Sequence, residues 1–150
     1  MVGNSDGIFS RCRNRGANHT NFGGFGIMSW NTIKLDKADI LFSRYIRLRD
    51  GKCVRCGRKG EGEERIKGLQ ASHFFSRRNE SVRYDLENVD ALCAGCHRYL
   101  GTEHRDEYEK FKKKQLGEVR LDMLRVRANT YQKRDRKLQA IIWKEMLNNL

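Results

Sequence analysis

Two Cys-x-x-Cys pairs constrain the fold of this chain more than any other feature. They are separated by 36 residues and consist of Cys53, Cys56, Cys93 and Cys96. Four thiolates in two pairs match the tetrahedral coordination of Zn²⁺ and leave no position for a catalytic water. Because paired cysteines in a reducing compartment are more often metal ligands than disulfides, the sequence predicts one structural zinc ion. Disulfides or free thiols are the alternative.

The composition explains why such a chain needs a metal. Of its 150 residues, 38% are apolar and 33% are charged, and the mean hydropathy is −0.80. A chain of this kind can bury only a small core. Zinc binding, worth on the order of 10 kcal/mol or more, can supply the missing stability.

The charge of the chain indicates its partner. It carries 31 Lys and Arg against 19 Asp and Glu, a net charge of +12. This excess favours nucleic acid over an acidic metabolite, with an anionic membrane surface as the second choice. No segment is apolar enough for a membrane span or a signal peptide, so we expect a soluble, cytoplasmic protein.

The chain divides into three predicted segments. Residues 1–33 are rich in glycine and asparagine and predict a flexible arm, with a solvated basic run at 11–15. Residues 34–101 hold the cysteines, and residues 102–150 predict a helical extension. The expected elements are a helix over 37–50 ended by Gly51 and strands over 66–75 and 89–92. A further helix is expected to open with the run at 93–100 and to close at Gly101, and the last three helices are expected over roughly 103–115, 117–128 and 131–148.

Three further residues stand in a distinctive spacing inside the cysteine frame. His73 and Asn88 have 14 residues between them, and Asn88 and His97 have 8. His97 follows Cys96, and neighbouring helix residues point about 100° apart, so His97 should face a surface other than the zinc. A hairpin packed on a helix would bring all three to one groove opposite the zinc. Taken singly, they are also compatible with a buried strand histidine, a turn former and a helix-surface residue.

The runs ASHFFSRR and DLENVDALCAGCH resemble the HNH endonuclease motif, also called ββα-metal or His-Me finger, on a four-cysteine treble clef. The wider run from Arg44 to Gly101 is similar to the phage NinG/Rap recombination endonucleases. The resemblance covers about residues 37–101. It implies an α+β fold, with a small zinc-stabilised ββα-metal core, flanking helices and a helical C-terminal tail.

The resemblance also implies roles for individual residues. His73 would be the general base that activates water, with a pKa near 6.5 unless its surroundings shift it. Asn88 would position its imidazole or the hairpin, and His97 would bind a catalytic Mg²⁺ or Mn²⁺. Arg77 and Arg78 suit a clamp on the scissile phosphate, although an exposed basic turn is the alternative.

One position departs from the commonest family pattern. Many relatives carry an aspartate metal ligand directly before the first histidine, and this chain has Ser72. A serine hydroxyl is a poor ligand, so we expect help for His97 from Asn88, from phosphate oxygens, or from Asp90 or His104.

These observations predict a metal-dependent HNH endonuclease that hydrolyses DNA. The resemblance implies phage recombination, branched DNA and a host cytoplasm. The alternative is a non-catalytic zinc module that binds nucleic acid, which Ser72 favours. A third possibility is an adaptor that recruits a partner through its helical tail.

An apolar stripe in the last helix packs on the zinc core or pairs with another chain, and we favour a homodimer. The stripe consists of Leu138, Ile141, Ile142 and Met146, with Trp143 beside it.

Overall fold

A helix with a cap at each end begins the described part of the chain. The computed structural model describes residues 35–150, so the predictions for the arm lie outside the described residues. α1 (Lys37–Asp50) starts at Asp36, whose carboxylate accepts a hydrogen bond from the backbone N–H of Asp39. The Asp39 carboxylate accepts one from the N–H of Asp36 in return. The predicted helix is therefore confirmed, with a capping box at its start.

A two-stranded hairpin follows, and it separates the cysteines from the first histidine. β1 (Leu69–His73) pairs antiparallel with β2 (Val89–Cys93). In this register Cys93 lies opposite Leu69 at one end, and His73 lies opposite Val89 at the other. β1 is shorter than predicted because Gly68, with φ of 83°, turns the chain just before it.

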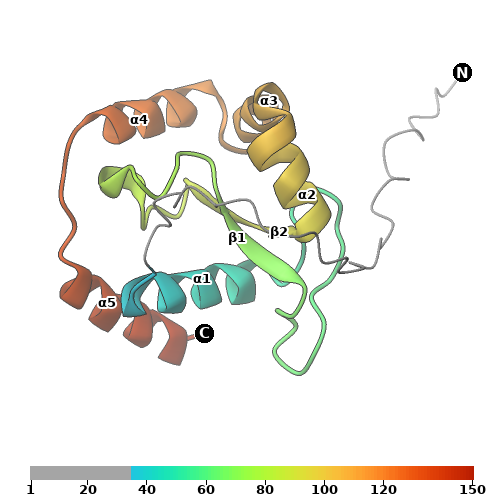
Figure 1. Ribbon diagram of the computed structural model, residues 1–150, viewed down its shortest axis with the longest axis vertical. Helices are drawn as coiled ribbons and strands as arrows, with labels where there is room; N and C mark the ends of the chain where they lie inside the picture. Colours follow the sequence, from blue (N-terminus) through green and yellow to red (C-terminus); the bar gives the residue numbers. More distant parts are fainter. Residues whose placement is uncertain (1–34) are drawn as a thin grey trace, which may run out of the picture. The chain divides into compact units, whose positions relative to one another are not determined.

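The remaining regular elements of residues 35–150 are helical (Figure 1). α2 (Ala94–Arg98) begins directly after Cys93 and continues into η2 (Tyr99–Glu103), a π-helical turn. Gly101 was expected to end this helix. It lies instead inside the helical segment, which continues to Glu103. The remaining elements are η1 (Glu80–Val82) in the hairpin connection and the helices α3 (Arg105–Leu116), α4 (Glu118–Asn129) and α5 (Arg136–Asn148).

The last helix begins five residues later than predicted, because the segment before it is bound to η1. The Ser81 hydroxyl donates to the Thr130 carbonyl at 2.5 Å. The Arg134 guanidinium donates to the Ser81 carbonyl at 2.7 Å. These bonds keep the linker out of a helix until Asp135, whose carboxylate accepts from two backbone N–H groups and caps α5.

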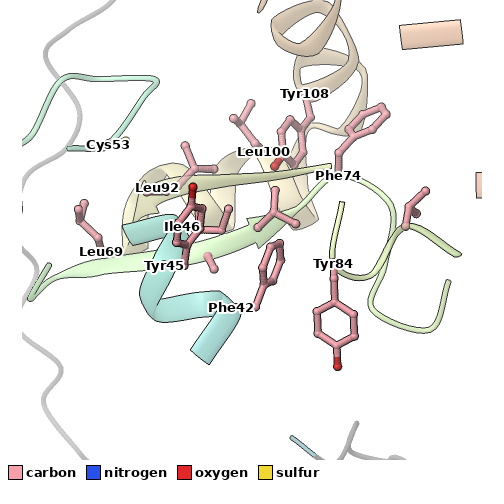
Figure 2. Packing of buried hydrophobic residues seen from close by; sticks show 14 of the residues in the cluster. Phe42, Tyr45, Ile46, Cys53, Leu69, Phe74, Tyr84, Leu92, Leu100 and Tyr108 are labelled. Atoms are coloured by element: carbon pink, nitrogen blue, oxygen red, sulfur yellow. The ribbon is translucent and has the colours of Figure 1, made fainter. Parts of the chain in front are cut away.

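The core lies on both faces of the hairpin (Figure 2). Phe42 and Ile46 of α1 cover one face, and Leu100 and Tyr108 cover the other, all at most 1% exposed. α5 adds Trp143, whose ring centroid is 4.6 Å from that of Phe42. Helices around a small antiparallel sheet, with four cysteines close together, confirm the predicted α+β fold.

The apolar stripe of α5 does not pack on the zinc core. Its side chains are 51%, 66%, 39% and 38% exposed for Leu138, Ile141, Ile142 and Met146, whereas Trp143 is 6% exposed. Trp143 therefore anchors α5, and the stripe faces outward. None of the helices in residues 35–150 has the length and apolar content that crossing a bilayer requires.

Candidate active site and metal centre

The four cysteines come together at one end of the hairpin. Their Sγ atoms all lie within 4.8 Å of one another, and those of Cys56 and Cys93 are 3.8 Å apart. Four sulfurs at the usual Zn–S distance of about 2.3 Å form a tetrahedron with edges of about 3.8 Å. The four thiols therefore fit a zinc site, with Cys53 and Cys96 as the other two ligands.

Local hydrogen bonds shape the first cysteine pair. The N–H of Gly57 donates to the Cys53 carbonyl at 2.8 Å, and Gly57 adopts a left-handed φ of 76° that glycine tolerates without strain. The N–H of Val54 donates to the Ala91 carbonyl in β2 at 3.0 Å. This bond ties the first pair to the strand that leads into the second.

The electrostatics of the cluster favour a bound cation. The pKa of the Cys53 thiol is lowered to about 4, mainly by a hydrogen bond from Cys96, while burial raises that of Cys56 to about 12. One thiolate thus opposes the formation of the next, and a dication relieves this repulsion. Arg55 lies 3.7 Å from the Cys96 sulfur and stacks over the Tyr99 ring at 4.1 Å.

His73 lies at the opposite end of the hairpin. Its Nε2 is 3.1 Å from the backbone carbonyl oxygen of Arg83. A carbonyl only accepts, so Nε2 carries the proton and Nδ1 carries the lone pair. Burial, together with the positive charge of Arg77, lowers the pKa of His73 to about 4. The surroundings therefore shift the pKa well below 6.5, and the imidazole is neutral near pH 7.

Asn88 is fully buried directly before β2. Its Oδ1 accepts from the N–H of Phe75 at 2.7 Å, and its Nδ2 donates to the carbonyls of Phe75 at 3.1 Å and Val82 at 2.9 Å. The side chain thereby clips together the hairpin connection that follows His73. These contacts suit a positioning role and not the alternative role of metal ligand.

His97 presents one ring nitrogen to its surroundings. Its Nδ1 is 2.7 Å from the Gln70 amide oxygen, so Nδ1 carries the proton and Nε2 carries the lone pair. A Cβ at Gly101 would lie 3.8 Å from Nε2 and 3.3 Å from Cδ2, and its absence leaves room beside the ring. Histidines that bind metals usually donate their other N–H to an oxygen in this way. Burial, and then Arg77, lower the pKa of His97.

A depression of about 280 Å³ runs between α1 and β1. His73 does not line the depression itself, but Arg77, which does, is close enough to lower the pKa of His73. It contains two guanidinium groups and, among the described residues, no carboxylate. We call it the cationic depression, and it is lined by Ser43, Arg47, Leu69, Gln70, Ala71, Arg77 and His97.

The position before His73 faces away from this depression. Ser72 is buried, and its Oγ lies 3.1 Å from the Tyr108 hydroxyl. Asp90, opposite Ser72 in the hairpin, forms a buried ion pair of 2.7 Å with Lys112 of α3. Asp90 was a candidate metal ligand, and this pairing contradicts that role because its carboxylate neutralises the lysine on the far face.

Two other predicted residues also lie apart from the cationic depression. Arg78 is exposed, does not line the depression, and donates its backbone N–H to Ser76. His104 stacks on Tyr99 with ring centroids 4.2 Å apart and does not line the depression that His97 lines, which argues against it as a second ligand. The structure thus brings together Arg77 and His97, with His73 beside them.

Three residues near the site were not predicted. Arg47 lies one turn after Ser43 in α1, and the helical spacing of the 37–50 segment could have indicated their shared face. Gln70 lies within the predicted strand that carries His73, but nothing in the sequence indicates its hydrogen bond with His97. No local sequence pattern indicates the role of Arg83, because its partner Asp39 is 44 residues away.

Residues 53–103, about a third of the chain, match a protein-family model described as HNH endonuclease. The matched segment begins at Cys53 and contains all four cysteines of the two pairs, together with His73, Asn88 and His97. The predicted HNH identity is therefore confirmed for this segment. No curated protein and no solved structure matches the chain.

Proposed function

We propose that this HNH segment, with the helices packed around it, forms a metal-dependent endonuclease that hydrolyses phosphodiester bonds in DNA. The observation that carries the proposal is the orientation of His73. Its Nε2 proton is held by the Arg83 carbonyl, which leaves Nδ1 as a neutral base on a ring that feels the charge of Arg77, a residue of the cationic depression. Such hydrolysis needs a base for water and positive charge at the phosphate.

In the proposed reaction, Nδ1 of His73 takes a proton from water, and the resulting hydroxide attacks phosphorus. The bond from phosphorus to the leaving oxygen breaks on the opposite side, that oxygen takes a proton from solvent water, and His73 releases its own proton to solvent. Arg77 and Arg47 bind the non-bridging oxygens, because two guanidinium groups in one depression attract an anion. Asn88 holds the hairpin connection in place.

His97 is the residue that fits a catalytic divalent ion. Its Nε2 lone pair and the space beside Gly101 suit a ligand role, and the Gln70 bond fixes the ring. A bound Mg²⁺ or Mn²⁺ would stabilise negative charge on the phosphate. Because no carboxylate lines the depression among residues 35–150, phosphate oxygens and water would have to supply the remaining ligands.

A non-catalytic zinc module that binds nucleic acid is the second candidate. The specific observation in its favour is Ser72, which replaces the usual acidic ligand and is bonded to Tyr108. Such a module would use the same cationic depression for phosphates but would not cleave them.

Cleavage of supercoiled plasmid separates the two candidates. We expect nicking with Mg²⁺ or Mn²⁺ and none with EDTA, measured beside a His73→Ala preparation purified in parallel. Salt-sensitive binding without nicking by the unaltered chain would replace the nuclease with the zinc module.

We further propose branched recombination intermediates as the DNA substrate, and a phage protein acting in the host cytoplasm. The support is the similarity of residues 44–101 to the NinG/Rap endonucleases. A four-way junction should be cleaved faster than a linear duplex of the same sequence. Equal rates would remove the branched substrate from the proposal and leave the endonuclease.

The exposed stripe of α5 supports a homodimer, which would present two sites to one junction. Light scattering at tens of micromolar protein should then give twice the monomer mass. Ile141→Lys, at the most exposed position of the stripe, should return the monomer mass, and a monomer without this change would contradict the dimer.

A further inference from the structure

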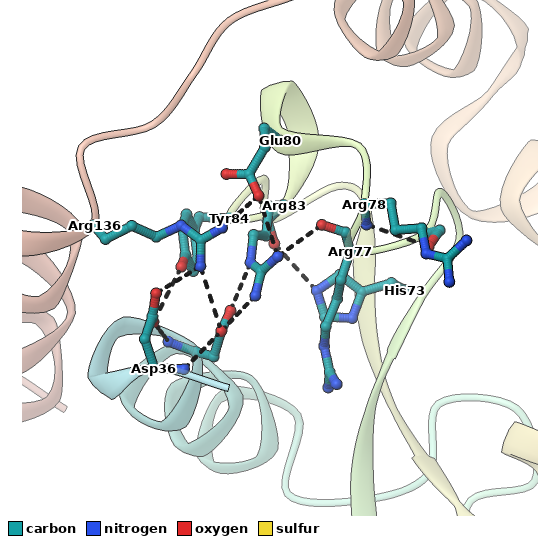
Figure 3. A network of polar contacts seen from close by, with 10 residues as sticks. Asp36, His73, Arg77, Arg78, Glu80, Arg83, Tyr84 and Arg136 are labelled. Carbon is teal, nitrogen blue, oxygen red and sulfur yellow. Dashed lines mark hydrogen bonds and ion pairs between the residues drawn. The ribbon is translucent and has the colours of Figure 1, made fainter. Parts of the chain in front are cut away.

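The side chain of Arg83, the buried residue whose carbonyl accepts from His73, has no part in the chemistry described so far. Arg83 is 2% exposed, and its Nε and Nη2 donate to the two carboxylate oxygens of Asp39 at 2.8 and 2.5 Å. Its Nη1 donates to the Arg77 carbonyl at 2.9 Å. Its own carbonyl accepts from His73 (Figure 3). One residue thus contacts both the proposed base and the backbone of the phosphate-binding arginine.

Two helices hold this arginine from outside the hairpin. Asp39 belongs to the capping box of α1. Arg136 of α5 pairs with Asp36 of that box at 2.6 Å and with Glu80 at 2.5 Å. Glu80 also accepts from Arg83 at 3.2 Å. The hairpin connection is therefore tied to α1 and α5 by one cluster of ion pairs (Figure 3).

Directionality distinguishes this cluster from a simple packing contact. A buried ion pair is often no more stable than apolar side chains of similar volume, so stability alone gives little reason for it. A guanidinium bonded to both oxygens of a carboxylate has a fixed orientation. Fixing the side chain of Arg83 also fixes its carbonyl, which selects the nitrogen of His73 that carries the proton.

We propose that Arg83 is a positioning residue that sets the tautomer and orientation of His73, held by Asp39 of α1 and through Glu80 by Arg136 of α5. The catalytic meaning of this role rests on the proposed function. The orientation of His73 is a property of the folded protein and can be measured without cleavage. The proposal also gives α1 and α5, which lie outside the matched HNH segment, a part in the site.

Arg83→Lys tests the proposal because it keeps the positive charge and removes the planar guanidinium, which binds both oxygens of the Asp39 carboxylate. The matched control is Arg125→Lys, which makes the same substitution at a surface guanidinium paired with Glu109 and Asp122. Three quantities are compared in the zinc-loaded full chain: the nitrogen chemical shifts of the His73 ring, the plasmid cleavage rate and DNA affinity. Zinc content and the circular dichroism spectrum establish that each variant is folded.

We expect His73 of the unaltered chain to show a single Nε2–H tautomer, and Arg83→Lys to show a mixture. Its cleavage rate should fall roughly 10- to 100-fold, as expected for a misplaced base. DNA affinity should change by less than about 3-fold, since the guanidinium of Arg77 remains. Arg125→Lys should match the unaltered chain in all three.

An unchanged His73 tautomer in folded Arg83→Lys would overturn the proposal, whatever the cleavage rate. If Arg83→Lys does not fold, Asp39→Asn takes its place, because asparagine keeps the shape of the partner. An unchanged His73 tautomer in folded Asp39→Asn would overturn the proposal in the same way. If the unaltered chain cleaves no DNA, the proposed function fails by itself, and the tautomer measurement still decides the role of Arg83.

Discussion

The two ends of the β1–β2 hairpin are built by different means. At the zinc end, where Leu69 pairs with Cys93, two ligands come from the turn over residues 53–56, whose hydrogen bonds are mostly local, and two from the junction of β2 with α2. At the histidine end, where His73 pairs with Val89, the geometry depends on residues far along the chain. Arg83 reaches back 44 residues to Asp39. The ends are four residue steps apart, about 13 Å in a strand.

This difference separates stability from chemistry. The zinc end cross-links α2, the hairpin and the loop after α1, so its loss should unfold the chain. The histidine end fixes the orientation of the His73 imidazole. Loss of His73 should therefore leave a folded protein that lacks the proposed activity. The following experiments disturb the two ends separately.

The largest effect is expected from Cys53→Ser. Removing one of four thiolates should cost most of the zinc-linked stability, on the order of 10 kcal/mol. The variant should be insoluble or partly unfolded and should not retain one zinc per chain after dialysis. A cooperative thermal transition equal to that of the unaltered protein would contradict the structural zinc. Cys12→Ser, outside the two pairs, is the control and should behave as the unaltered chain does.

The second experiment breaks only the histidine end. His73→Ala should keep zinc, fold and DNA binding, and should lose cleavage by roughly 10²- to 10⁴-fold. Single-turnover rates at saturating protein measure this loss directly. Cleavage at the unaltered rate in a carefully purified sample would remove His73 from the base role.

The contrast between the ends also explains what the sequence could predict. The Cys-x-x-Cys pairs, the helix over 37–50 and the strand bearing His73 are local patterns, and the structure has them close to where they were predicted. The role of Trp143 as the anchor of α5 was missed, because helical spacing alone does not say which face meets Phe42. The pairing of Asp90 with Lys112 could not be predicted either, since it depends on how α3 crosses the hairpin.

The third experiment separates two arginines that are neighbours in sequence. Arg77 lines the cationic depression and Arg78 does not, although both were predicted to clamp the phosphate. Arg77→Ala should weaken DNA binding and lower the salt dependence of affinity by about one counterion. Arg78→Ala should have a smaller effect on both. Equal losses, measured by fluorescence anisotropy at several salt concentrations, would mean that the depression is not the phosphate site.

The smallest effect is expected from pH. The folded pKa of His73 is about 4, below the ordinary value of 6.5, so between these values the unfolded chain binds a proton that the folded chain does not. Stability should therefore fall on acidification through this window, by at most about 1.4 kcal/mol per pH unit from this residue. Urea unfolding of the unaltered chain and of His73→Gln at pH 7 and 5.5 measures it. An identical pH dependence would contradict the lowered pKa.

The contact between α1 and α5 bears on how the chain folds. Arg136 and Asp36 are 100 residues apart in sequence, and Trp143 packs on Phe42 near the same place. The entropic cost of closing a loop rises with its length, and folds with many such distant contacts form slowly. The turn that holds Cys53 and Cys56 can form early, because it closes over a few residues. We therefore expect the search that returns α5 to α1 to limit the folding rate, so that the orientation of His73 is completed last.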